Sequence, residues 1–307
     1  MSALPRLAAR VDTQALGRAA TVALYDELAL DPKPGLVSFV DSGSHDDMDA
    51  GTLLRSLFAL RRYFPAIAAA GAADADFAEL QRLGIAAEAR MLTATGGINT
   101  HRGAVFTLGL LCAAAGRLLA KGDALTPAAL RTALLDRWGA DLAELAGRPR
   151  QSHGRDAARR HGLRPAAAEA ALGFPMLFDV ALPALRRAAA LGSRLARLQT
   201  LFALMAQLDD TNLAHRGGLA GLRWAQQQAR DFLAAGGAAH PDAVLRAQAL
   251  HAEFVARRLS PGGVADLLAA ACWLDRVTTD AAPTLTAFAA PRGGASAAPG
   301  GRAPPTA

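Results

Sequence analysis

Apolar residues recur every three or four positions along almost the entire chain, and this spacing is the strongest constraint that the sequence places on its fold. Convincing strand-like alternation of apolar and polar residues is not found. Hydrophobic residues make up 52% of the 307 residues but aromatic residues only 5%, so alanine and leucine supply most of the apolar content. Both are strong helix formers, and the sequence therefore predicts an all-α protein.

Prolines, glycines and capping residues divide this pattern into about ten helices joined by short polar loops. The first is expected from Asp12 to Leu30, because the prolines of "DPKPG" end it. A second is expected to begin at Ser44 as N-cap and to continue toward Pro65. Further helices are expected over 74–95, from His101, from Thr126, over 165–172, 174–190, 193–208, 217–233 and 241–259, and from Ser260.

No linker-like composition interrupts this helical part, so we predict one globular multi-helix domain over residues 1–280. Residues 281–307 are rich in Ala, Pro, Gly and Ser, which predicts a disordered C-terminal tail. The most apolar stretch, 103–116, is shorter than the ~20 residues of a membrane helix, and the N-terminus lacks the pattern of a secretory signal. We expect a soluble cytoplasmic protein without a membrane partner.

The charges of the chain are mixed rather than segregated. Its 33 Lys and Arg residues outnumber 27 Asp and Glu residues, but they form no long basic run and are not interleaved with stacking aromatics. Nucleic-acid binding normally adds one of these features, so we expect small phosphorylated ligands instead. Cys112 and Cys272 lie in apolar helical runs and indicate neither a metal site nor a disulfide.

The loop "PKPGLVSFVDSGSHDDMDAG" is unusually dense in polar groups. On a helix capped by Ser44, the side chains of His45, Asp46 and Asp49 would share one face. Mg²⁺ binds one or two carboxylates together with phosphate oxygens, so Asp46 and Asp49 are candidate metal ligands. Helix-dipole stabilisation is the alternative for these acids. Lys33, between two prolines, is either a phosphate ligand or an ordinary solvated lysine.

Nearly the same polar sequence opens two helices, as "NTHRGA" and "NLAHRGG". The amides at a helix start bind anions, and arginine can grip a phosphate in a bidentate manner. We therefore expect both sequences to face one phosphate-rich site. The candidate ligands for substrate phosphates are Asn99 and Arg102 in the first, and Asn212 and Arg216 in the second; Asn99 is also a candidate helix cap.

Acids and histidines beside these two sequences extend the candidate site. Asp209 and Asp210 precede the second one and are further candidate Mg²⁺ ligands. Glu88 shares a helix face with the turn before the first one and is a candidate general base. The histidines His45, His101 and His215 are candidate acids. A third loop contributes Ser152 and His153 as candidates for anion binding.

Five motifs together resemble the triphosphoribosyl-dephospho-CoA synthase family. In chain order they are "PKPGLVSFVDSGSHDDMD", "EARMLTATGGINTHRGA", "SHG" ahead of "EAALGFP", "DDTNLAHRGG" and "SPGGVADLLA". The resemblance runs from about Leu16 to Val277, and the first motif resembles the malonate decarboxylase branch more than the citrate lyase branch.

The resemblance implies an enzyme whose substrates are ATP and 3'-dephospho-CoA. It would displace adenine from ATP and join the triphosphoribosyl unit to the 2'-hydroxyl of dephospho-CoA. The product would be the precursor of an acyl carrier protein's prosthetic group, with Mg²⁺ as the expected cofactor. Which histidine assists adenine departure stays open, as does the oligomeric state, with a homodimer as one option.

Two other classes of function remain alternatives at this point. One is a Mg²⁺-dependent all-helical hydrolase of the ADP-ribosyl type, which would release ribosyl product without an acceptor. The other is a non-catalytic partner of a carrier protein, in which the polar loops would be merely structural. Release of adenine that requires both ATP and dephospho-CoA would separate the synthase from both.

Overall fold

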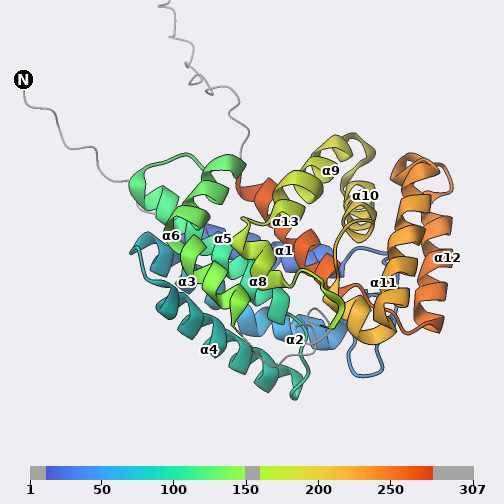
Figure 1. Ribbon diagram of the computed structural model, residues 1–307, viewed down its shortest axis with the longest axis horizontal. Coiled ribbons are helices and arrows are strands. Elements are labelled where there is room, and N and C mark those ends of the chain that lie inside the picture. Colours follow the sequence, from blue (N-terminus) through green and yellow to red (C-terminus); the bar gives the residue numbers. More distant parts are fainter. Residues whose placement is uncertain (1–11, 149–159, 279–307) are drawn as a thin grey trace, which may run out of the picture.

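Helices account for the regular structure of the chain, as the spacing of its apolar residues predicts (Figure 1). The computed structural model describes residues 12–148 and 160–278, and no strand occurs within these ranges. The all-α fold class is confirmed. The α-helices are α1 (Thr13–Leu28), α2 (Ala50–Leu60), α3 (Tyr63–Ala72), α4 (Phe77–Thr95), α5 (Arg102–Lys121), α6 (Pro127–Gly147), α8 (Ala166–Ala171), α9 (Leu182–Arg187), α10 (Ser193–Met205), α11 (Thr211–Ala234), α12 (Ala243–Ala256) and α13 (Gly262–Val277).

Several helix boundaries follow the capping residues of the sequence. Thr126 caps α6 through its side chain, which accepts a hydrogen bond from Ala129 N, and Pro127 occupies the first helical position. Helix α4 ends at Gly96, whose left-handed backbone (φ 70°) suits glycine. The predicted tail, 281–307, lies outside the described residues.

The predicted second helix is wrong in its start and its length. Ser44 does not cap a helix, because its hydroxyl donates instead to the carbonyl of Leu259, 2.6 Å away and distant in the sequence. Residues 31–49 form an irregular loop, and α2 begins only after Asp49, which caps it by accepting from Thr52 N. A turn then separates α2 from α3, which has Pro65 near its start, where a missing amide is tolerated.

Other boundaries differ for local reasons. The helix expected over 174–190 is divided into a π-helical segment (Met176–Ala181), α9 and a 3-10 turn (Ala189–Leu191). Helix α11 begins at Thr211, earlier than expected, because Asp210 caps it; Gly218 breaks its regular dihedrals (φ 63°). Ser260 does not cap α13, since its hydroxyl meets His45 instead.

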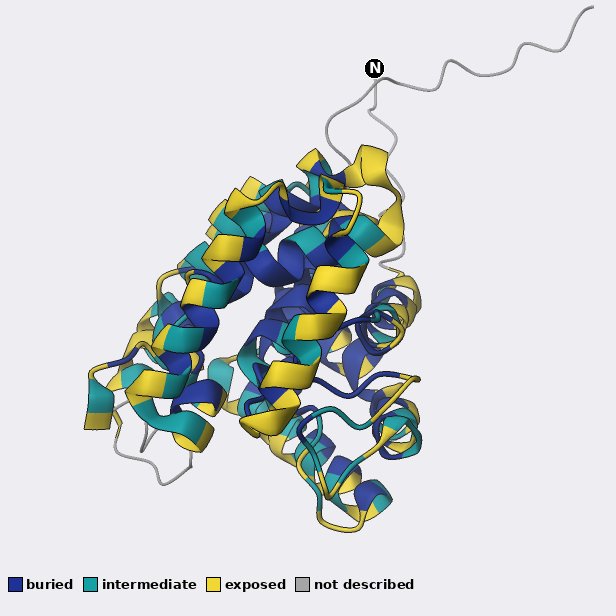
Figure 2. Ribbon diagram, turned by 90° about the vertical axis from the view of Figure 1, so that its right-hand side faces the viewer, coloured by how far each residue is buried: buried dark blue, intermediate teal, exposed yellow. Residues whose placement is uncertain are grey.

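Figure 2 shows the buried residues, in dark blue, on the inward faces of the helices. Helix α5 is largely buried and packs most extensively against α3. The two backbones approach closely because glycines face them: a Cβ on Gly71 would lie 2.0 Å from the carbonyl oxygen of Ala113, and one on Gly116 would lie 2.0 Å from that of Ala68. By length and composition α5 could span a membrane, but 72% of its apolar window is buried within the protein. Its apolar character therefore serves the core.

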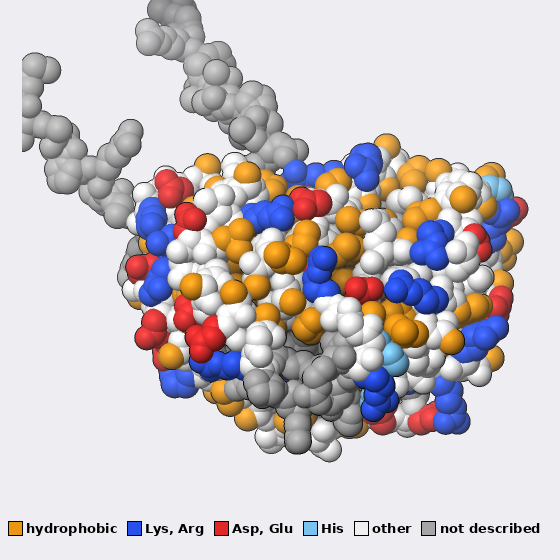
Figure 3. All heavy atoms as spheres, viewed as in Figure 1, with side chains coloured by type: hydrophobic (Ala, Val, Ile, Leu, Met, Phe, Trp, Pro, Cys, Tyr) orange, Lys and Arg blue, Asp and Glu red, His pale blue; other side chains and the backbone are white. Residues whose placement is uncertain are grey.

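Helices from the two ends of the chain meet around α5. Helix α13 packs on both α1 and α5, while α11 and α12 lie at the opposite end of the molecule from α3 and α4 (Figure 1). On the face drawn in Figure 3, basic and acidic side chains are interspersed among apolar ones. This arrangement brings the start of α5 next to the start of α13.

Candidate active site

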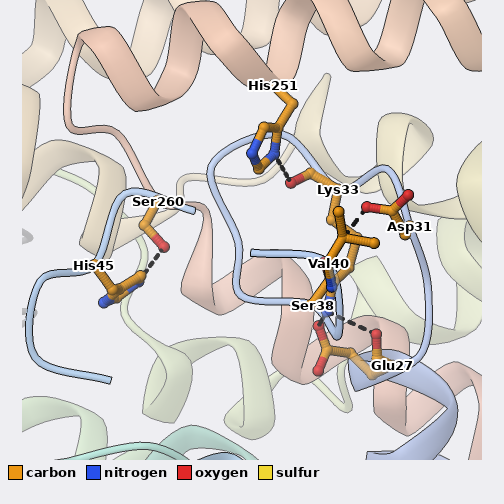
Figure 4. Close-up of polar contacts among 8 residues, drawn as sticks. All are labelled: Glu27, Asp31, Lys33, Ser38, Val40, His45, His251 and Ser260. Atoms are coloured by element: carbon orange, nitrogen blue, oxygen red, sulfur yellow. Dashed lines mark hydrogen bonds and ion pairs between the residues drawn. The ribbon is translucent and has the colours of Figure 1, made fainter. Parts of the chain in front are cut away.

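A buried ion pair anchors the beginning of the loop over residues 31–49. Lys33 Nζ lies 2.6 Å from Glu27 Oε1 and 2.7 Å from the carbonyl oxygen of the same residue, near the end of α1 (Figure 4). The lysine side chain has no exposed surface. Its burial lowers the pKa of the Lys33 ammonium, and Glu27 opposes that shift. The pair therefore fixes the loop against α1.

Histidines from two places hold the same loop to the C-terminal part of the chain. His251, on α12, bonds through Nδ1 to the carbonyl of Lys33 (2.8 Å), and its Nε2 lies 3.1 Å from Asp41 Oδ2. His45 Nε2 lies 2.9 Å from Ser260 Oγ, just before α13 (Figure 4). The loop thereby connects α1, α12 and α13.

Arg216 of α11 completes the surroundings of His45. Its guanidinium donates to the carbonyl of Ser44 (2.9 Å) and to His45 Nδ1 (3.1 Å). Because Arg216 can only donate, its contact favours a ring proton on Nε2, directed at Ser260, whereas Asp47 Oδ1, 3.4 Å from Nδ1, favours a proton on Nδ1. Burial, followed by the positive charge of Arg216, lowers the pKa of His45. His45 is thus a neutral imidazole that joins three segments.

His101 occupies the start of α5 and is almost fully buried. Its Nδ1 lies 2.6 Å from Ser56 Oγ of α2, and the hydroxyl of Thr100 donates to the same oxygen. Within the described residues its Nε2 has no hydrogen-bond partner. Burial, and then the charge of Lys33, lower the pKa of His101 to about 4, so the ring is neutral at physiological pH.

Asp210 joins the starts of two helices. Its Oδ1 accepts from the amides of Asn212 and Leu213 in α11, and its Oδ2 accepts from the amide of Val264 in α13. The side chain is buried, which raises the pKa of the carboxyl, while these amide hydrogen bonds oppose the shift. One carboxylate therefore aligns two helix starts.

Asp266 lies in the second turn of α13 and faces the start of α5. A Cβ on Gly103 would lie 1.9 Å from Asp266 Oδ2, so only glycine leaves room for the carboxylate. The carboxylate also accepts a hydrogen bond from the amide of Ala104. Burial, then the negative charges of Asp210 and Glu27, raise the pKa of Asp266 well above its usual value.

The starts of three helices thus meet around two ionisable residues, the buried Asp210 and the partly buried Asp266. Asp266 connects α13 to α5, and Asp210 connects it to α11. Aligned peptide dipoles make helix starts favourable for anions, and the two carboxylates are anions bound there by the protein itself. The arrangement can therefore hold a phosphorylated ligand beside groups able to hold or transfer a proton.

Residues 13–284 match the protein family described as ATP:dephospho-CoA triphosphoribosyl transferase (CitG). The chain belongs to this family. A probable 2-(5''-triphosphoribosyl)-3'-dephosphocoenzyme-A synthase from Stutzerimonas stutzeri is 40% identical over 296 residues, which cover 94% of this chain and all of that protein. One from Azotobacter vinelandii is 43% identical over 89% of this chain and 93% of its own length. No solved structure matches the chain.

Membership of this transferase family makes the chain an enzyme, as its motifs predict. The predicted meeting of the two repeated polar sequences also has a structural counterpart. These two sequences lie at the starts of helices α5 and α11. Both helix starts contact the first turns of α13, α5 through Asp266 and α11 through Asp210. Their arginines, however, point to different partners.

Arg102 of the first sequence pairs with Glu88. Its Nε lies 3.0 Å from Glu88 Oε2, with the arginine side chain 46% exposed and the glutamate 33% exposed. Asn99 accepts from the amide of Arg102 and so acts in part as a cap, as predicted. Glu88, Asn99 and Arg102 therefore form one group at the start of α5.

The acids predicted to bind Mg²⁺ are not gathered in one place. Asp49 caps α2, Asp210 binds backbone amides through both oxygens, Asp46 is exposed and Asp209 is half-buried. Within 12–148 and 160–278, no three His, Cys, Asp or Glu side chains are placed to hold a metal together. The described residues thus form no metal cage of their own.

The remaining predicted residues are placed as follows. Asn212 and His215 are exposed on α11, and the amide of Asn212 contributes to the cap by Asp210. Ser152 and His153 lie outside the described residues. The ammonium of Lys33 is buried and bonded to Glu27. Its predicted role in binding phosphate stays a prediction.

Several residues of this site were not predicted from the sequence, among them Glu27, Ser56, His251, Ser260 and Asp266. Asp266 carried a usable signal, because it is the one charged side chain in the apolar stretch "GGVADLLAAACWL". Glu27 stands in a helical run just before the loop of Lys33. The two serines are ordinary in sequence, and only tertiary contact with His101 and His45 distinguishes them.

Proposed function

We propose that this enzyme transfers the triphosphoribosyl unit of ATP to the 2'-hydroxyl of 3'-dephospho-CoA and releases adenine. The observation that carries the proposal, together with the family match, is the meeting of the α5, α11 and α13 helix starts beside buried ionisable groups. The aligned dipoles of three helix starts favour a polyanion such as a triphosphate, although Asp210 and Asp266 already accept from several of their amides. The reaction passes through an oxocarbenium-like state, as in glycoside transfer.

The test is to incubate the protein with ATP, Mg²⁺ and dephospho-CoA and to measure free adenine by chromatography. Adenine release that needs both substrates, with a matching gain in mass of dephospho-CoA, is the expected result. Release of adenine or ribosyl product without the acceptor would favour a hydrolase instead. No release in the complete mixture would contradict the proposal.

Phosphate binding is assigned to the start of α5 and to the arginines. Arg102 is half exposed and, among the residues that the structure describes, pairs only with the partly exposed Glu88, so a phosphate can compete for its guanidinium. Arg216 is committed to Ser44 and His45, and we propose that it acts by holding the loop over 31–49 in place. His101 Nε2 is available to donate to a substrate oxygen.

Mg²⁺ is proposed to enter with the triphosphate. Magnesium commonly takes most of its ligands from phosphate oxygens and water, with only one or two carboxylates, so a site without its own metal cage fits this mode. When bound, the ion would neutralise triphosphate charge. Of the four predicted metal ligands, Asp49 and Asp210 cap helices, and Asp46 and Asp209 do not.

Glu88 is the proposed general base for the 2'-hydroxyl. Its carboxylate lies beside the start of α5 and keeps a third of its surface exposed. A Glu88→Gln enzyme should lose about 10²–10⁴-fold in kcat, the usual contribution of a general base. Full activity in a normally folded Glu88→Gln enzyme would remove it from this role.

The proposed destination of the product is the acyl carrier protein of a malonate decarboxylase. The motif "LVSFVDSGSHDDMD" supports this branch over citrate lyase. Both branches would use one precursor, so deletion of the gene in its own host distinguishes them better than an assay of the product. Loss of growth on malonate, with growth on citrate retained, is expected.

A further inference from the structure

The proposed transfer requires one proton to reach adenine. As the bond from the anomeric carbon to adenine breaks, its electron pair goes to the purine, which is a poor leaving group unless a ring nitrogen is protonated. The 2'-hydroxyl loses a proton when it attacks. The overall reaction therefore moves one proton from the hydroxyl to adenine, and the enzyme needs an acid that holds a proton at neutral pH.

The buried histidines of the site do not meet this need. His101 is neutral, because burial lowers its pKa to about 4. His45 is also neutral, because burial and then the charge of Arg216 lower its pKa. Each can donate a hydrogen bond, but neither carries the extra proton of an imidazolium. His215 lies on the exposed side of α11.

Asp266 is a carboxyl placed where three helix starts meet. Gly103 leaves room for it, and the amide of Ala104 fixes its orientation toward α5. The residue is only partly buried, unlike Asp210, so a ligand can reach it. It therefore lies beside the α5 amides proposed to face the substrate.

The charges around Asp266 favour its protonated form. Glu27 faces it from α1 and is paired with Lys33, and Asp210 faces it from the start of α11 and is satisfied by backbone amides. Asp266 is left with the Ala104 amide and no cation among its described contacts. Its pKa is raised by burial and by both neighbouring carboxylates.

We propose that Asp266 is the general acid that protonates adenine as it leaves. This inference rests on the proposed function. The carboxyl proton passes to a ring nitrogen of adenine, the carbon–nitrogen bond breaks, and the ribosyl carbon is attacked by the 2'-oxygen. The hydroxyl proton, taken up by the base, restores the Asp266 acid through solvent, so that the cycle closes.

The test compares two leaving groups in wild-type and Asp266→Asn enzymes. With ATP and dephospho-CoA, the variant should lose about 10²–10⁴-fold in kcat. With 7-methyladenosine triphosphate, whose cationic purine leaves without protonation, the variant should lose less than about tenfold. An equal loss on both nucleotides would show a structural role only, and full activity on ATP would also overturn the inference.

A second measurement uses the wild-type enzyme and does not depend on the folding of a variant. With ATP, kcat should fall as the pH rises and Asp266 ionises, and this decline should be absent with 7-methyladenosine triphosphate. Identical pH profiles on the two nucleotides would refute the acid role. Wild-type enzyme that releases no adenine from ATP would instead refute the proposed function itself.

Discussion

Replacement of Lys33 by methionine tests the anchoring of the loop over residues 31–49. Methionine keeps the apolar length of the side chain but removes the ammonium. Glu27 Oε1 then loses the ammonium at 2.6 Å, and the Glu27 carbonyl oxygen loses it at 2.7 Å but keeps the amide of Leu30 as a donor. Both lie in a region where the lysine side chain is fully buried and that of the glutamate is 9% exposed.

The magnitude follows from breaking the buried ion pair, which leaves Glu27 Oε1 without a partner among the described residues. A buried acceptor without a partner costs about 1–3 kcal/mol, and removing one member of a buried ion pair costs about 3–5 kcal/mol. We therefore expect Lys33→Met to lower the free energy of unfolding by about 3–5 kcal/mol. At about 2–4 °C per kcal/mol, the thermal midpoint should fall by roughly 6–20 °C.

The assay is thermal and urea unfolding at pH 7, with two comparison variants. The double variant Lys33→Met with Glu27→Leu removes both charges and should recover most of the lost stability. Arg82→Met breaks the exposed pair with Glu79 and should leave the midpoint nearly unchanged. A Lys33→Met protein as stable as wild type, or a double variant no better than the single one, would refute the reasoning.

Three further predictions concern the start of α5. Gly103→Ala should abolish adenine release and cost about 1–3 kcal/mol of unfolding free energy, because its Cβ would lie 1.9 Å from Asp266 Oδ2; Gly147→Ala, with open space around it, is the control and should unfold like wild type. Because the pKa of His101 is lowered to about 4, the unfolded chain takes up the proton first, and the free energy of unfolding should fall by roughly 3 kcal/mol as the pH falls from 6.5 toward 4. Urea titrations of a His101→Gln protein should lack this pH dependence. Arg102→Ala should raise the KM for ATP or abolish turnover in steady-state assays, and unchanged kinetics would exclude it from the site.

Local signals predicted the fold well where local interactions decide the structure. Thr126 caps α6 and Gly96 ends α4, because each acts on amides or dihedrals within a few residues of itself. Ser44 failed as a predicted cap, because its hydroxyl finds the carbonyl of Leu259 across the fold. The preference of serine for helix caps is a local statistic and contains no information about an acceptor that is distant in the sequence.

The candidate site was predicted in its parts but not in its connections. His45, His101 and Arg216 were recognised as chemical groups, yet their partners Ser56 and Ser260 depend on tertiary packing that no spacing rule contains. The grouping of Asp46 and Asp49 assumed a helix that the chain does not form there. Motif resemblance, by contrast, predicted the family correctly, because it does not depend on which loops meet.

The double role of Asp210 has a consequence for local unfolding. Its two oxygens hold amides of α11 and of α13, so neither helix start can open without releasing the carboxylate that the other needs. Amide protons of Leu213 and Val264 should therefore exchange with solvent as one cooperative unit, with a common opening free energy despite their separation in sequence. Fraying at one helix start would therefore raise the rate of amide exchange at the other.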